Sequence, residues 1–244
     1  MEGSTASRAA IQWAATEAVR RGGELVVANV YDWRVIGARA PIGGAIADDA
    51  RVRAELLVDS AVADARTFEP NVNVRGEAVQ GSPGHTLITA STSSDLMVVG
   101  SRGRGGFASL MLGSVGQQVA THAAGPVVVV RGRPDIAGGP IVVGVDGSPS
   151  ADHVVGVALA EAAARGTGVV AIRAYTSNDP PVGSRAPIRL ENPEERREAE
   201  YETLVNDVAS WKEKYPRMRC RRRSRGRGPH RVVLDRTARH DTEG

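Results

Sequence analysis

Cysteine, aromatic residues and long apolar runs are all scarce in this chain of 244 residues. Its single cysteine, Cys220, excludes an internal disulfide and a cysteine-rich metal site. No apolar run reaches the about 18 residues that suggest a membrane-spanning helix, and Met1 leads straight into a polar segment rather than a secretory signal. These absences predict a protein of the reducing cytoplasm that does not enter a membrane.

Catalytic and metal-binding patterns are also missing. No Ser-His-Asp set and no carboxylate pair is indicated by the spacing of these residue types. The histidines have neither metal-ligand spacing nor a paired acid, and they stand at His85, His122, His153, His230 and His240. We therefore expect no enzyme activity and no metal site built from side chains.

Glycine, by contrast, is plentiful between Asp95 and Arg131. Leu96 to Val99 form a short apolar run that is typical of a buried strand. The chain then enters a glycine-rich loop, after which Ser114 is a residue type that caps a helix. Gly125 and Pro126 are expected to end that helix, and Val127 to Val130 predict another buried strand.

A strand, a glycine loop and a capped helix together favour anion binding. Glycines let backbone N–H groups come close to a ligand, and a helix N-terminus carries unpaired N–H groups and about half a positive charge. Arg102 and Arg104 add charge of the same sign. We interpret the stretch as a phosphate cradle. The alternative is a glycine-rich turn that merely connects a strand to a helix.

The spacing of the glycines is more specific than their number. Two residues separate Gly100 from Gly103, and nine residues separate Gly103 from Gly113, which stands directly before Ser114. This pattern resembles the nucleotide-binding motif of the universal stress protein family. Two other phosphate-binding motifs do not fit. A Walker A loop would need Gly-Lys-Ser/Thr, which is absent. The residues from Gly103 to Ala108 match the Rossmann pattern loosely, but the acidic residue that would contact the ribose about 20 positions later is missing.

The chain also contains an internal repeat. The segment from Pro140 to Tyr175 aligns with the residues up to Tyr31 at a constant offset of 144. The second copy opens with an apolar strand that leads into Asp146, whereas the first copy has only Met1 and Glu2 before the matching position. We expect the first copy to lack its first strand. The second copy is expected to lack the glycine loop and the last strands.

Strands that alternate with helices predict an α/β fold. We expect two tandem doubly wound domains of the universal stress protein type, with mainly parallel sheets, both incomplete. The first spans residues 1–131, a linker spans 132–139, and the second spans 140–244 with an arginine-rich tail from about residue 217.

The resemblance implies which residues would hold a nucleotide. In the family, an acid after the first strand contacts the ligand, the end of the second strand holds adenine, and the glycine loop holds phosphates and ribose. Val30 matches the adenine position, while Gly144 and Asp146 match the first strand of the second copy. The candidate loop residues are Gly100, Ser101, Arg102, Gly103, Arg104, Gly105, Gly106, Gly113, Ser114 and Val115.

The resemblance further implies a stress-response regulator that binds ATP, with or without Mg, forms a homodimer and acts on an unidentified protein partner. Asp146 has a simpler interpretation, which we favour. An acid before a helix stabilises the helix dipole by about 0.3–1 kcal/mol. An interaction scaffold that binds no nucleotide is the alternative function, since each copy lacks part of the site.

Positive charge is concentrated at the end of the chain. Twelve Arg or Lys residues and two acidic residues lie between Trp211 and His240, which gives this segment a net charge of +10. Because the whole chain has a net charge of +3, the rest of it carries −7. This tail could bind nucleic acid weakly, be solvated and disordered, or be an altered end of the second domain. From about residue 217 onward the tail lacks stacking aromatics, so nucleic acid is not the expected partner. We favour the altered end, and expect Cys220 in a strand.

Overall fold

The structure is a computed structural model of the chain, and it describes residues 1–32, 43–101, 112–132, 139–174, 193–209, 211–215, 218–223 and 230–236. The chain divides into two compact units, Met1–Ala137 and Gly138–Gly244, called here the first and second unit. Two tandem units agree with the internal repeat. The proposed limits of the domains and of the linker stay predictions.

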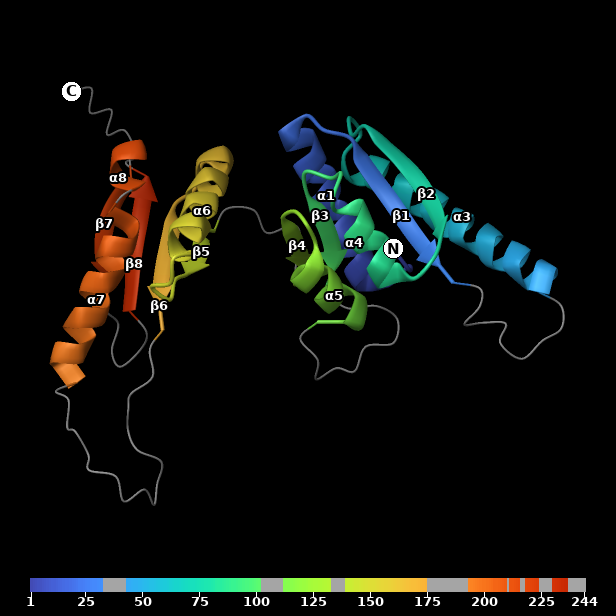
Figure 1. Cartoon of the computed structure of the whole chain (residues 1–244). Coiled ribbons are helices and arrows are strands. Elements are labelled where there is room, and N and C mark those ends of the chain that lie inside the picture. Colours follow the sequence, from blue (N-terminus) through green and yellow to red (C-terminus); the bar gives the residue numbers. More distant parts are fainter. Residues whose placement is uncertain are drawn as a thin grey trace, which may run out of the picture. The chain divides into compact units, whose positions relative to one another are not determined.

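In the first unit, helices and strands alternate along the chain (Figure 1). The elements are α1 Thr5–Arg21, β1 Leu25–Tyr31, α3 Gly43–Phe68, β2 Val74–Gln80, α4 Pro83–Ala90, β3 Met97–Gly100, α5 Ser114–His122 and β4 Val127–Val130. In the second unit they are β5 Ile141–Gly144, α6 Ala151–Arg165, β6 Val169–Arg173, α7 Pro193–Ala209, α8 Trp211–Lys214, β7 Met218–Arg223 and β8 His230–Arg236.

Local sequence signals set most helix ends. The Ser4 hydroxyl oxygen accepts a hydrogen bond from the Ser7 N–H at 3.1 Å, so Ser4 caps α1. Gly22 ends α1 in the left-handed conformation with φ 67°, and the equivalent Gly166 ends α6 with φ 66°. One cap differs from the expectation. The N-cap of α5 is Gly113, and Ser114 is the first helical residue.

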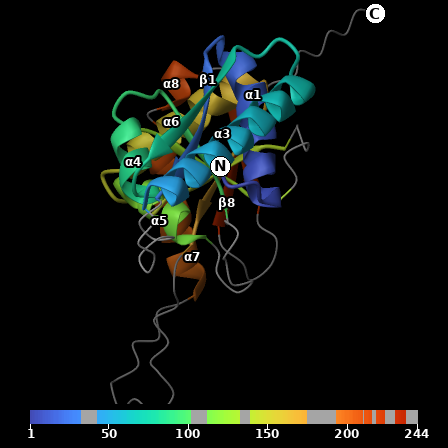
Figure 2. The ribbon, with the colours of Figure 1, turned by 90° about the vertical axis from the view of Figure 1, so that its right-hand side faces the viewer.

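The strands of the first unit form two parallel pairs. β1 pairs with β2 from Leu25↔Val74 to Tyr31↔Gln80, and β3 pairs with β4 from Met97↔Val127 to Gly100↔Val130. Helix α1 contacts both pairs, and α3 packs on β1 and β2, as Figure 2 shows for α3 and β1. The Met1 amine donates a hydrogen bond to the carbonyl oxygen of Ala28 in β1 at 2.5 Å. A first strand missing before Gly3 stays a prediction.

The second unit has one four-stranded sheet in the order β5-β6-β8-β7. β5 and β6 are parallel, from Ile141↔Val169 to Gly144↔Ile172, whereas β8 runs antiparallel to both of its neighbours, β6 and β7. An α/β fold with mainly parallel strands is thus confirmed. The antiparallel hairpin is a feature that the sequence did not predict. Cys220 lies in β7, which confirms its expected place in a strand.

Helices cover one face of this sheet. Val143, Val169 and Ala171 are at most 4% exposed and pack against α6 and against Leu204 and Val208 of α7. The strand residue beside them, Val142, is 61% exposed. Because neighbouring residues of a strand point to opposite faces, this contrast marks a covered face and an open face in the described part of the sheet.

Candidate functional site

The two ends of the glycine loop are held together by backbone hydrogen bonds in the first unit. The Ser101 N–H donates to the Val130 carbonyl oxygen at 3.0 Å, which extends the β3–β4 pairing by one residue beyond Gly100. The Gly113 N–H then donates to the Ser101 carbonyl oxygen at 2.9 Å. Since Gly113 is the N-cap of α5, these two bonds place the start of α5 at the carboxyl end of β3.

The start of α5 has the features of an anion site. Its first intrahelical bond runs from the Gln117 N–H to the Gly113 carbonyl oxygen at 2.8 Å, so helix geometry leaves the N–H groups of Ser114, Val115 and Gly116 without an intrahelical acceptor. The first turn contains no acidic residue that would compete for these donors. The positive end of the helix dipole adds to the attraction for an anion.

Gly100 is the point of closest packing at this edge. A Cβ at this position would lie 2.8 Å from the carbonyl oxygen of Ala6 in α1, a backbone atom that cannot move aside by changing rotamer. Gly116 packs on the other side, where a Cβ would be in ordinary contact with the Gly100 carbonyl oxygen at 3.5 Å. Glycine at residue 100 therefore lets α1, β3 and α5 meet at one place.

Half of the predicted loop residues can be placed. The structure brings Gly100, Ser101, Gly113, Ser114 and Val115 together at the end of β3. Val30 lies at the penultimate position of β1, in the other strand pair of the unit. The remaining predicted loop residues lie outside the described part of the chain: Arg102, Gly103, Arg104, Gly105 and Gly106.

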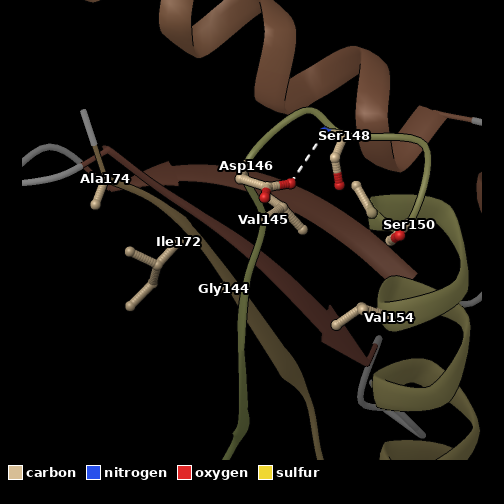
Figure 3. Close-up of a pocket in the computed structure, with 9 residues that line it drawn as sticks. Gly144, Val145, Asp146, Ser148, Ser150, Val154, Ile172 and Ala174 are labelled. Carbon is tan, nitrogen blue, oxygen red and sulfur yellow. Dashed lines mark hydrogen bonds between the residues drawn. The ribbon is translucent and has the colours of Figure 1, made fainter.

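The second unit contains an open pocket of about 410 Å³, shown in Figure 3. It lies where the carboxyl ends of β5 and β6 meet the start of α6, which is the edge at which ligands bind in open α/β sheets. Two predicted residues, Gly144 and Asp146, line it. The other lining residues are Val145, Ser148, Ser150, Ala151, Val154, Ile172 and Ala174.

Asp146 is the charged group of this pocket. Its Oδ1 accepts a hydrogen bond from the Ser148 N–H at 2.9 Å (Figure 3). Hydrogen bonding by the Ser148 hydroxyl and by its N–H, with a smaller contribution from the charge of Arg173, lowers the pKa of the Asp146 carboxyl below its usual range. The carboxylate is therefore ionised at neutral pH and presents an acceptor at the pocket wall.

Our preferred interpretation of Asp146, an acid that stabilises the dipole of the following helix, stays a prediction. Helix α6 begins at Ala151, and the acid in its first turn is Asp152. Asp146 lies five residues before the helix, in a turn where Gly147 has φ 77°. Its carboxylate accepts a hydrogen bond from the Ser148 N–H and so fixes the turn that forms one wall of the pocket.

Arg173 supports that turn from the end of β6. Its Nε lies 2.5 Å from the Glu200 Oε2 of α7, and both side chains are mostly buried. A Cβ at Gly147 would lie 2.6 Å from the Arg173 Nη1, so the guanidinium packs directly against the turn. A left-handed glycine is repeated in the first unit, where the equivalent Gly3 has φ 76°.

The sequence analysis missed most of the pocket wall. Ser148, Ser150, Val154, Ile172 and Ala174 were not among the predicted residues, although the internal repeat contained part of the signal. The offset of 144 residues places Val30, the predicted adenine contact, on Ala174. Ala174 could therefore have been predicted by applying the family's site positions to the second copy of the repeat as well as to the first.

The described residues contain neither a cluster of metal ligands nor a helix suited to a membrane. No group of three or more His, Cys, Asp or Glu side chains is arranged to hold a metal ion within the described residues. Among the helices described, none combines the length and the apolar character needed to cross a bilayer.

Comparisons with known proteins agree with this architecture. The model of the universal stress protein family matches residues 1–131 and again residues 139–240. A universal stress protein of Mycolicibacterium smegmatis is 31% identical over 232 residues, which cover 91% of this chain and 76% of that protein.

One solved structure of the family shows the same fold over most of the chain. The crystal structure of a universal stress protein from Archaeoglobus fulgidus aligns with this chain at a TM-score of 0.60 and 17% sequence identity. The alignment covers 86% of this chain and 72% of the Archaeoglobus chain. A universal stress protein solved in complex with cAMP matches 54% of this chain and 91% of its own with a TM-score of 0.42 and 22% identity. The cAMP is a ligand of that protein.

Proposed function

Because the chain belongs to the universal stress protein family, we propose that it binds an adenine nucleotide, ATP, and acts as a stress-response regulator. One observation carries the proposal. The hydrogen bonds from Ser101 to Val130 and from Gly113 to Ser101 hold the start of α5 at the carboxyl end of β3. The backbone N–H donors and the positive end of α5 at this edge support a phosphate cradle of the kind that the family resemblance implies.

In this proposal the phosphates bind to the first unit. The N–H groups of Ser114 and Val115 donate to phosphate oxygens, and the loop residues from Arg102 to Gly106 complete the cradle. Charge-assisted bonds of this kind are stronger than those between neutral groups. Any Mg would arrive with the phosphates, since Mg commonly binds through substrate phosphates and one or two carboxylates.

The pocket of the second unit supports binding of an adenine ring at a separate place. Val145, Val154 and Ile172 offer apolar contacts to a flat ring, and Asp146 offers an ionised acceptor to the ring's amino group. Such a combination of apolar walls and a few polar groups is usual for small-molecule sites. We propose that this pocket holds the base of an adenine nucleotide bound by the second unit.

We also propose that the protein acts by binding and not by turnover. The placed cradle residues supply N–H donors and a hydroxyl group, but no histidine or carboxylate that could serve as a general base. A cytoplasmic location, a homodimer and a regulated protein partner belong to the same proposal. Its support is the family resemblance.

The substitution Ser114→Pro tests the cradle. It removes one N–H donor, and proline fits the first position of a helix. The residue before it, Gly113, is already extended at φ −73° and ψ 160°, as proline requires. A hydrogen bond to a charged group contributes about 1.5–3 kcal/mol, so we expect the affinity for ATP to fall by about 10- to 100-fold in calorimetric titration.

Ser114→Ala is the matched control. This change removes the hydroxyl of an exposed side chain but keeps the N–H, so its affinity should stay nearer to that of the parent protein. Thermal unfolding of both variants checks that α5 remains formed. A proline variant that is folded and binds ATP as tightly as the alanine variant would show that this N–H is no phosphate ligand.

A further inference from the structure

The pocket of the second unit offers a ligand no positive side chain among the described residues. Its lining residues include no Lys, Arg or His, and Asp146 is the one that carries a charge. A phosphate monoester carries a charge of about −1.5 to −2 at pH 7. Because like charges repel more strongly near a protein surface than in bulk water, the Asp146 carboxylate would oppose a phosphate at this wall.

Arg173 lies behind this wall, and an acid of α7 holds it there. Its guanidinium packs against the turn, where a Cβ added at Gly147 would lie 2.6 Å from the Arg173 Nη1. Its Nε lies 2.5 Å from the Glu200 Oε2, and the two side chains are only 15% and 20% exposed. Since Glu200 compensates the charge of Arg173, the pair adds little net attraction for a phosphate in the pocket.

The start of α6 differs in charge from the start of α5. The first turn of α5 contains no acid, whereas that of α6 contains Asp152, whose Oδ1 accepts a hydrogen bond from the Trp211 Nε1 at 2.7 Å. One donor of α6 is also in use, because the Ala151 N–H donates to the Ser148 carbonyl oxygen at 2.9 Å. A carboxylate near a helix N-terminus offsets the positive end of the dipole, so α6 attracts an anion less than α5 does.

The other features of the pocket suit an uncharged ligand with a flat ring and hydroxyl groups. Ile172 of β6 and Val154 of α6 line it from two sides, as Figure 3 shows, and Val145 adds a third apolar contact. The Ser150 hydroxyl does not cap α6, and a hydroxyl can both donate to and accept from the hydroxyls of a ribose. The volume of about 410 Å³ lies within the range of small-molecule sites.

We propose that the pocket of the second unit binds the uncharged nucleoside adenosine in preference to its phosphorylated forms. The inference rests on the proposed function, which assigns an adenine ring to this pocket, and it adds which adenine compound the pocket selects. Asp146 is the specificity-determining residue, because its carboxylate accepts from the amino group of the ring and repels a phosphate. The two units then differ in their ligands, with phosphates held at α5 and a nucleoside held at α6.

Calorimetric titration with adenosine and with AMP tests the preference in the full chain. Ser114→Pro is present in all samples, so that the weakened cradle of the first unit contributes little to the signal. We expect adenosine to bind about 3- to 10-fold more tightly than AMP, as repulsion between partly screened charges implies. The preference should shrink as NaCl is added, because salt screens the repulsion between exposed charges.

Asp146→Asn in the same background assigns the preference to one side chain. Asparagine keeps an oxygen that can accept from the Ser148 N–H but loses the charge, so the ratio of the two affinities should fall close to one. Glu161→Gln is the matched control and should leave the ratio unchanged. It removes the same charge from α6, at a residue that pairs with Arg165 and stands about 15 Å from Ala151 along the helix.

The possible results separate this inference from the proposed function. AMP that binds as tightly as adenosine, or a preference that Asp146→Asn leaves intact, overturns the selection of a nucleoside while the adenine site of the second unit stands. A protein that binds neither compound overturns that adenine site as well. The phosphate cradle of the first unit is judged separately, by the titration of the parent protein with ATP.

Discussion

Replacing Leu159 by alanine should lower the free energy of unfolding of the second unit by about 2–5 kcal/mol. Leu159 is 1% exposed and lies in α6 within the cluster that joins this helix to the sheet and to Leu204 of α7. The change removes apolar contact and leaves a cavity that the close-packed surroundings can fill only in part. Since a domain is stable by only about 5–15 kcal/mol, the loss is a large fraction of the total.

Urea unfolding followed by the fluorescence of Trp211 measures this effect. Trp211 is a local reporter, because its Nε1 donates to the Asp152 Oδ1 of α6 at 2.7 Å. Trp13 and Trp33 are replaced by phenylalanine in all samples, so that only the second unit reports. Val157→Ala, at a side chain 51% exposed on α6 of the same unit, is the control and should change stability by at most about 0.5 kcal/mol. Equal losses from both substitutions would refute the core described for the second unit.

Gly100→Ala should destabilise the first unit by about 1–3 kcal/mol, in the range of overpacked sites. The new Cβ would meet the Ala6 carbonyl oxygen at 2.8 Å, so either α1 or the end of β3 must move. Movement of β3 also displaces Ser101, whose carbonyl oxygen positions Gly113 and the start of α5. We therefore expect the affinity for ATP to fall together with the stability.

Gly23→Ala is the matched control for this effect. A Cβ at Gly23 would have no atom within 4 Å, and its backbone lies outside the left-handed region. Its melting temperature should stay close to that of the parent protein in a thermal unfolding scan, and its ATP titration should be unchanged. A Gly100→Ala protein that melts and binds like the parent would contradict the close packing of α1 against β3.

Features that depend on neighbouring residues were predictable from the sequence. The serine cap at Ser4, the proline in the first turn of α4 and the tandem α/β units all follow from local signals or from the repeat. The apolar pattern of the long helix in the first unit starts at Ile46, whereas the helix itself begins three residues earlier, at Gly43. Such shifts are common at helix ends, where local propensities compete weakly.

Features that depend on distant residues were not predictable. The N-cap of α5 falls on Gly113 and not on Ser114, and a hydrogen bond to Ser101, across the loop, holds that residue in place. β8 pairs with β6 across more than fifty residues of chain, and no local pattern specifies an antiparallel partner at that distance. The wall of the pocket, including Ser148 and Ile172, is likewise assembled from segments that are separate in the sequence.

Hydrogen–deuterium exchange of the full chain, with and without saturating ATP, tests the proposed nucleotide site most directly. The N–H groups of Ser114 and Val115 have no intrahelical acceptor, and a phosphate bound to them would supply one. We predict slower exchange in peptides that cover residues 100–116 when ATP is present, with no change in α7. ATP that leaves residues 100–116 unaffected, or that slows exchange only elsewhere, would contradict the assignment of the phosphate cradle.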